Sequence, residues 1–156
     1  MTHRCVQSSL ESAERLCRAK GLAFTELRRQ VYALIAAEET PVRAYDLLDQ
    51  LKKQRSNAAP VTVYRALDFL LEAGLVHRVD ALHAYTACDA ESTDHGGLLL
   101  VCNRCNAITE FENHPLEREI ARTALNHEFH PADDLIEIRG LCGQCVDGGE
   151  PDDDAE

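Results

Sequence analysis

The chain has 156 residues, enough for one ordinary domain or two small ones, and its composition of 45% hydrophobic and 28% charged residues is that of a globular protein. No apolar run approaches the roughly 20 residues of a membrane-spanning helix, and the first residues lack the apolar core of a signal peptide, so we expect a cytoplasmic protein. Seven cysteines in such a chain favour metal binding over a disulfide framework.

Charge is distributed unevenly along the chain. The formal net charge is −11, but residues 1–88 hold 12 basic and 10 acidic side chains, whereas residues 89–156 hold 4 basic and 17 acidic ones. The first half is therefore compatible with an approach to nucleic acid, and the two halves are expected to have different tasks. The last segment, residues 147–156, is acidic and almost without apolar residues, so we expect a disordered tail there.

Helical periodicity dominates the first half of the chain. Apolar stripes with helical spacing predict four helices, around residues 10–17, 27–35, 44–51 and 63–71. Thr25 is expected to cap the second helix, Pro60 to begin the fourth, and Gly74 to end it.

After Gly74 the pattern changes to alternation. Residues 75–79 and 83–88 are predicted to form two strands joined by a turn at 80–82. Helices followed by a hairpin are typical of a winged helix-turn-helix, which we expect at residues 1–88, with a hinge at 89–96. Strands at 98–101, 107–112 and 135–138 and a helix at 115–127 predict a small α/β domain over residues 97–146. The predicted fold class is α+β.

Two Cys-x-x-Cys pairs are the strongest chemical signal in the sequence. They are Cys102 with Cys105 and Cys142 with Cys145. Each pair can direct two thiolates at one ion, and two pairs complete a closed tetrahedral site, which predicts structural zinc. A redox pair would normally begin a helix after a strand, whereas both pairs here are expected at strand ends.

The fourth predicted helix is a candidate recognition helix. Its first turns carry Thr62, Tyr64 and Arg65 opposite the apolar stripe, and Tyr45 begins the preceding helix. A recognition helix enters the major groove with its N-terminal residues, and an arginine there can bind a guanine edge with two hydrogen bonds. Contacts to the phosphate backbone are expected from other basic residues of this half, namely Arg28, Arg29, Arg43, Lys52, Lys53 and Arg55.

A second metal site is suggested by residues on either side of the hinge. His77, Cys88, His95 and Glu110 together offer two imidazoles, a thiolate and a carboxylate, which is a plausible zinc ligand set. Spacing alone does not single them out, because His83, His114, His127 and His130 are also available.

The segments AYDLLDQL and APVTVYRALDFLLEAGLVHRV, followed by the two cysteine pairs, resemble the ferric uptake regulator family over about residues 8–146, and its zinc uptake regulator branch in particular. The family departs from this chain in two places: it often has Thr-Pro-x-Arg where Thr25-Glu26-Leu27-Arg28 stands, and a histidine of a third metal site is replaced around Asp133-Asp134.

The resemblance implies a homodimeric, zinc-responsive repressor of zinc uptake and homeostasis genes that binds an A·T-rich, inverted-repeat operator in double-stranded DNA. It implies two Zn²⁺ per monomer, one structural at the four cysteines and one regulatory. The branch's regulatory ligands fall on His77, Cys88, His95 and Glu110. A third metal site is not expected.

Three alternatives remain open at this point. The same fold can sense iron, nickel, manganese or peroxide. A small zinc enzyme such as a deaminase is a more distant alternative, but it needs a His-x-Glu motif and a Pro before a cysteine pair, and the chain has neither. A zinc-ribbon interaction module would not need the fourth helix or the hairpin.

Overall fold

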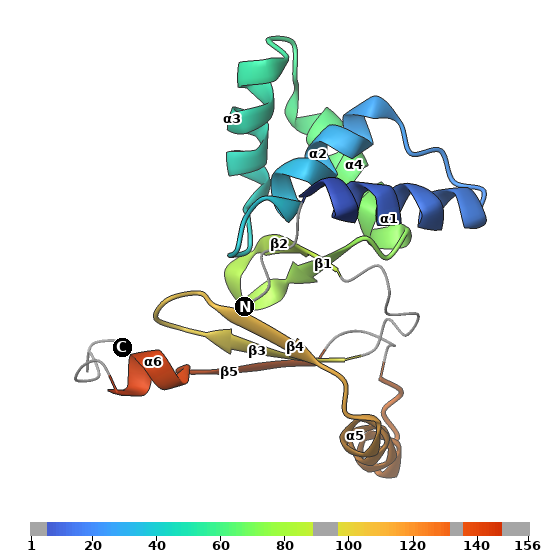
Figure 1. The fold of residues 1–156 in the computed structure, drawn as a ribbon. Coiled ribbons are helices and arrows are strands. Elements are labelled where there is room, and N and C mark those ends of the chain that lie inside the picture. The colour runs from blue at the N-terminus through green and yellow to red at the C-terminus, as the bar shows by residue number, and fades with distance from the viewer. Residues whose placement is uncertain (1–5, 89–96, 132–135, 148–156) are drawn as a thin grey trace. The chain divides into compact units, whose positions relative to one another are not determined.

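The computed structural model describes residues 6–88, 97–131 and 136–147. They belong to two compact units, within residues 1–95 and 96–156, which we call the N-terminal and the C-terminal unit (Figure 1). The expected hinge, at 89–96, lies outside the described residues, and so does the expected tail, at 147–156, except for its first residue, Asp147, which ends a short helix. No helix in the described part of the chain is both long and apolar enough to cross a bilayer.

The N-terminal unit is built on four helices that enclose one apolar core. Leu47, Leu51, Leu67 and Leu70 are completely buried there, and Tyr32 is nearly so. The apolar stripes seen in the sequence are the faces that meet in this core, as the predicted periodicity requires. The helices are α1 (Val6–Ala19), α2 (Glu26–Ala36), α3 (Ala44–Gln54) and α4 (Pro60–Glu72).

Both ends of α4 are set by the residues that the sequence predicts. Pro60 stands in the first turn, where a missing N–H costs nothing. Gly74 follows the helix with φ +74°, a conformation that favours glycine. The N–H of Leu75 donates to Leu70 O at 2.9 Å, and that of Gly74 to Leu71 O at 2.9 Å. This pair of bonds is a Schellman motif, and it turns the chain from α4 directly into the hairpin.

The hairpin consists of β1 (Val76–Val79) and β2 (Ala84–Ala87), joined by a short 3-10 helix, Asp80–Leu82. The strands are antiparallel, and Val76 pairs with Ala87. A third segment joins this sheet at Val42, just before α3: the N–H of Val42 donates to Tyr85 O, and the N–H of Tyr85 to Val42 O, both at 2.8 Å. Helices and hairpin together form a winged helix-turn-helix.

The C-terminal unit is a three-stranded mixed sheet with one helix of moderate length. Strand β3 lies between the other two, antiparallel to β4 and parallel to β5. The elements are β3 (Leu98–Cys102), β4 (Ile108–Phe111), α5 (His114–Asn126), β5 (Ile136–Gly140) and α6 (Gly143–Asp147). Within this unit α5 lies near one end of the sheet and α6 near the other (Figure 1).

Two local expectations need correction. Thr25 does occupy the N-cap position of α2, but its side chain makes no capping hydrogen bond, and only its carbonyl accepts, from Arg29 N at 2.9 Å. Helix α6 was not expected, because five residues beside a cysteine pair are too short to show helical periodicity.

The C-terminal unit buries far less apolar surface than the N-terminal one. Among its described side chains only those of Leu98, Leu99, Val101 and Cys102 are buried, and none of those on α5 is. Several large apolar side chains are instead exposed, namely Leu100, Leu116, Leu125, Phe129, Ile138, Leu141 and Val146. A sheet with so thin a core needs a further source of stability.

Replacing Leu67 by alanine is expected to destabilise the N-terminal unit by about 2–5 kcal/mol, because Leu67 is fully buried and the deletion leaves a cavity. Urea unfolding followed by the helical circular-dichroism signal measures the loss. Leu22→Ala, at an exposed position, is the matched control. Equal stabilities of the two variants would contradict the packing described above.

Candidate metal centre and nucleic-acid interface

The four cysteines of the two pairs come together at one end of the central strand of the C-terminal unit. Cys102 is the last residue of β3, and Cys105 follows in the turn toward β4. Cys142 and Cys145 lie just after β5, the parallel neighbour of β3. Asn106 completes the first turn with φ +59°, which asparagine adopts more readily than most residues, and its N–H donates to Cys102 O at 3.0 Å.

The geometry of the four sulfur atoms fits a tetrahedral zinc ion. All four lie within 4.8 Å of one another, and the Sγ atoms of Cys105 and Cys142 are 3.7 Å apart. Zn–S bonds of about 2.3 Å place neighbouring sulfurs of a tetrahedron about 3.8 Å apart, whereas a disulfide needs about 2.05 Å. The four thiolates form a closed site, with no open position for a substrate water.

Hydrogen bonds from the backbone prepare one of these sulfurs to be a thiolate. The pKa of Cys102 is lowered to about 6, chiefly by the N–H groups of Cys105, Cys142 and Arg104. The N–H of Cys142 lies 3.4 Å from Cys102 Sγ. The pKa of Cys145 is raised to about 12, first by its side-chain hydrogen bond with Cys142. Zinc requires all four as thiolates, so metal binding here releases protons.

Two of the four residues expected in the second metal site lie together on the hairpin of the N-terminal unit. His77 is on β1, opposite Thr86, and Cys88 follows β2 with its N–H donating to Leu75 O at 2.9 Å. Both side chains are buried, and their ligand atoms lie within 4.8 Å of each other. Histidine is buried less often than the apolar residues, and a neutral imidazole and a thiolate at this distance can bind one metal ion together.

The other two expected ligands are on the far side of the hinge or within it. Glu110 is an exposed residue of β4 in the C-terminal unit. His95 lies outside the described residues.

All four predicted DNA-binding residues lie in the first two turns of α3 and α4. Tyr45 on α3 is 71% exposed and Tyr64 on α4 is 53% exposed. Arg65 is also exposed, and no described residue forms an ion pair with its guanidinium group. Thr62 is half-buried because it faces α2. Tyr45, Tyr64 and Arg65 therefore lie exposed at the beginnings of the two helices, where side chains of a helix-turn-helix can meet the edges of bases in a groove.

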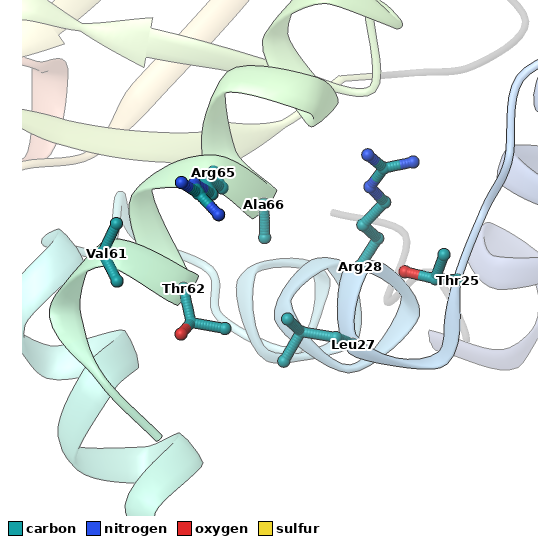
Figure 2. Close-up of a pocket in the computed structure, with 7 residues that line it drawn as sticks. All are labelled: Thr25, Leu27, Arg28, Val61, Thr62, Arg65 and Ala66. Carbon is teal, nitrogen blue, oxygen red and sulfur yellow. The ribbon is translucent and has the colours of Figure 1, made fainter. Parts of the chain in front are cut away.

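A shallow pocket of about 280 Å³ separates the beginnings of α2 and α4 (Figure 2). Thr62 and Ala66 project from α4 toward α2 across this space, and Arg28 rises from α2 beside them. The pocket is lined by Thr25, Leu27, Arg28, Val61, Thr62, Arg65 and Ala66.

Three of the basic residues expected at the phosphate backbone also serve the fold. The guanidinium carbon of Arg28 lies 3.6 Å from the centre of the Phe69 ring. Arg29 forms an ion pair with Glu14 at 2.9 Å, and Arg55 Nε donates to Gln30 Oε1 at 2.8 Å. Sequence reasoning missed these roles because they depend on which helices cross. The sequence also gave no reason to single out Val61, which is exposed about one helical turn before Arg65.

These features define a winged-helix protein with a separate unit closed by four thiolates. The sequence matches the profile of the ferric uptake regulator family over residues 19–139. The chain belongs to the ferric uptake regulator family.

Several relatives carry zinc in their names. The chain is 35% identical over 148 residues to the zinc uptake regulation protein of Escherichia coli K12, covering 94% of this chain and 86% of the relative. A solved zinc uptake regulator complexed with zinc and DNA has a TM-score of 0.85 at 35% identity, covering 92% of this chain and 97% of that one. Holo XcZur has a TM-score of 0.80 at 37% identity, covering 90% and 99%.

Replacing one ligand of the four-thiolate site, as in Cys142→Ser, is expected to remove about one tightly bound metal ion per chain and to unfold the C-terminal unit. Elemental analysis of the purified variant and limited proteolysis measure these effects. Cys17→Ala is the control, because Cys17 lies in the helical core of the other unit. Full metal content in Cys142→Ser would rule out the four-thiolate assignment.

Proposed function

We propose that this protein is a zinc-responsive transcriptional repressor, with zinc as corepressor, that controls zinc uptake and homeostasis genes. The observation that carries the proposal is the combination of exposed side chains at the beginnings of α3 and α4 (Tyr45, Tyr64 and Arg65) with a four-cysteine site. Both occur in a chain that is similar along nearly its whole length to zinc uptake regulators. Members of this family are transcription regulators rather than enzymes. With this function we also propose that the protein acts in the cytoplasm.

Two Zn²⁺ ions per monomer are proposed. Cys102, Cys105, Cys142 and Cys145 would hold the structural ion, whose binding free energy compensates for the thin core of the C-terminal unit. His77, Cys88, His95 and Glu110 would hold the regulatory ion. The support for this second site is the buried pair of His77 and Cys88 on the hairpin, since a thiolate and an imidazole suit zinc.

The regulatory ligands come from both sides of the hinge, and this suggests how zinc controls DNA binding. When His77 and Cys88 share an ion with His95 and Glu110, the hairpin is tied to the C-terminal unit. The two recognition helices of a dimer would then be held at the separation of successive major grooves. Without the ion, DNA binding would itself have to fix the N-terminal unit relative to the C-terminal unit, and the lost conformational entropy would weaken the affinity. Zinc therefore acts by population shift, and DNA must tighten zinc binding by the same factor.

The C-terminal unit is proposed to form the homodimer. Leu100, Ile138 and Leu141 line a hollow of about 480 Å³ on its sheet, and Leu116 and Leu125 of α5 are exposed as well. Exposed apolar surface of this extent is typical of a protein interface, and a second copy of the chain is the occupant that an inverted-repeat operator requires. The operator is proposed to be A·T-rich.

A regulator of the same family that senses another metal or peroxide is the second candidate. Iron and manganese favour sites richer in oxygen and nitrogen ligands, whereas the proposed regulatory site contains the thiolate of Cys88. The buried position of Cys88 beside His77 is the feature that favours zinc.

Cys88→Ser is expected to abolish zinc-dependent DNA binding while leaving the fold and the structural ion in place, because only the regulatory site loses a ligand. Zinc per chain, measured by elemental analysis, should fall from about two to about one, as it should in the unaltered protein after mild chelation. Thr86→Ala, on the same face of the hairpin, is the control and should keep both ions.

Two results would contradict the proposed regulatory site. One is Cys88→Ser protein that still binds DNA normally in high zinc. The other is unaltered protein that never takes up more than one zinc ion on titration, which would leave the structural site and direct the search to another effector.

Arg65→Ala is expected to weaken zinc-dependent DNA binding by about 1–3 kcal/mol, the usual cost of losing a two-bonded contact to a base. Its zinc content should not change, since Arg65 is exposed on α4 and distant in sequence from every proposed ligand. Fluorescence anisotropy with labelled duplex measures the affinity, and Arg18→Ala on α1 is the matched control. Loss of zinc from Arg65→Ala would mean that the residue has a different role.

A further inference from the structure

The exposed face of α4 contains one apolar residue, Val61, that does not pack in the hydrophobic core. Val61, Tyr64, Arg65 and Asp68 are exposed and follow the helical spacing i, i+3, i+4 and i+7, so they share one face. Val61 is 56% exposed and does not belong to the hydrophobic core. Valine is also a weaker helix former than alanine, so its presence there does not stabilise α4.

Exposed apolar side chains in the N-terminal unit are concentrated where DNA is expected. Among its described residues, the large apolar side chains classed as exposed are Leu22, Tyr45, Val61 and Tyr64. Three of the four lie in the first two turns of α3 or α4. Val61 is thus continuous with the surface that the proposed function assigns to the major groove, beside a guanidinium group that no described residue neutralises.

We propose that Val61 is a specificity-determining residue that reads a thymine. Its two methyl groups would contact the C5 methyl of thymine, the one apolar group that a base pair presents in the major groove. Val61 and Arg65 are four positions apart in the helix, or about 6 Å along its axis, which corresponds to roughly two base-pair steps of 3.4 Å. The thymine therefore lies about two base pairs from the base that Arg65 contacts. This inference rests on the proposed DNA-binding function.

The test begins with a pool of DNA duplexes whose central 30 base pairs or so are random, selected by binding to the zinc-loaded, full-length protein. Each thymine of the selected duplex is then replaced, one at a time, by deoxyuridine, which pairs identically but lacks the C5 methyl. In the unaltered protein, one thymine per half-site should show an increase in Kd of about fourfold on replacement, as the loss of one buried methyl contact predicts.

Val61→Ala removes this contact from both half-sites of the proposed dimer, so it should bind the unmodified duplex about sixteenfold more weakly and should no longer respond to deoxyuridine at the sensitive thymine of either half-site. Val61→Thr, which keeps one methyl group, should retain part of the response. Leu22→Ala, which also truncates an exposed apolar side chain, should behave like the unaltered protein. Thermal unfolding should be the same for the Val61 variants and the unaltered protein, so a change in affinity reports the contact and not the fold.

The inference fails if replacing each thymine by deoxyuridine changes the Kd of Val61→Ala as much as that of the unaltered protein. It also fails if Tyr64→Ala, but not Val61→Ala, loses the change in Kd at the sensitive thymine. Both results leave DNA binding intact. Failure of the proposed function is a different result, in which the zinc-loaded protein enriches no duplex from the pool.

Discussion

The convergence of four sulfur atoms is the constraint on which the C-terminal unit depends. Two turns, separated by a strand, a helix and a second strand, must bring their cysteines within 4.8 Å, and the sheet order β4-β3-β5 achieves this by placing the ends of β3 and β5 side by side. Because few of the unit's described side chains are buried, apolar packing alone gives it little stability. A metal at these sulfurs would join the end of β3 to the segment that follows β5, and the proposed dimer would use the exposed apolar residues of the same sheet.

Much of the molecule could be predicted from its sequence because its signals are local. Pro60 and Gly74 set the ends of α4 where expected, and the Cys-x-x-Cys spacing placed the four thiolates together. The class α+β and the family were confirmed by the fold and the comparisons. Long-range features were not accessible: the parallel pairing of β3 with β5 and the burial of His77 depend on how distant segments pack. Thr25 shows the opposite error, since a residue suited to capping occupies the cap position without using its hydroxyl.

The uneven charge of the sequence has a physical counterpart in how the arginines are used. Arg29 is neutralised by Glu14, and Arg28 is held over Phe69, so these side chains stabilise the crossing of α2 with its neighbours. Arg65 has no such described partner and remains available. The modest excess of positive charge in the first half is thus divided between holding the helices together and presenting a reading surface, and counting charges alone cannot separate the two uses.

The two hydrogen bonds between Val42 and Tyr85 have a mechanical consequence. They make the segment before α3 the third member of the hairpin sheet, so the beginning of α3 is fastened to β2 through rigid backbone and not through adaptable side chains. Tyr45 lies three residues after Val42, and Cys88 lies three residues after Tyr85, just beyond the end of β2. A displacement of the hairpin therefore reaches the start of α3 through a few residues of hydrogen-bonded backbone. It does not have to pass through the side chains of the helical core.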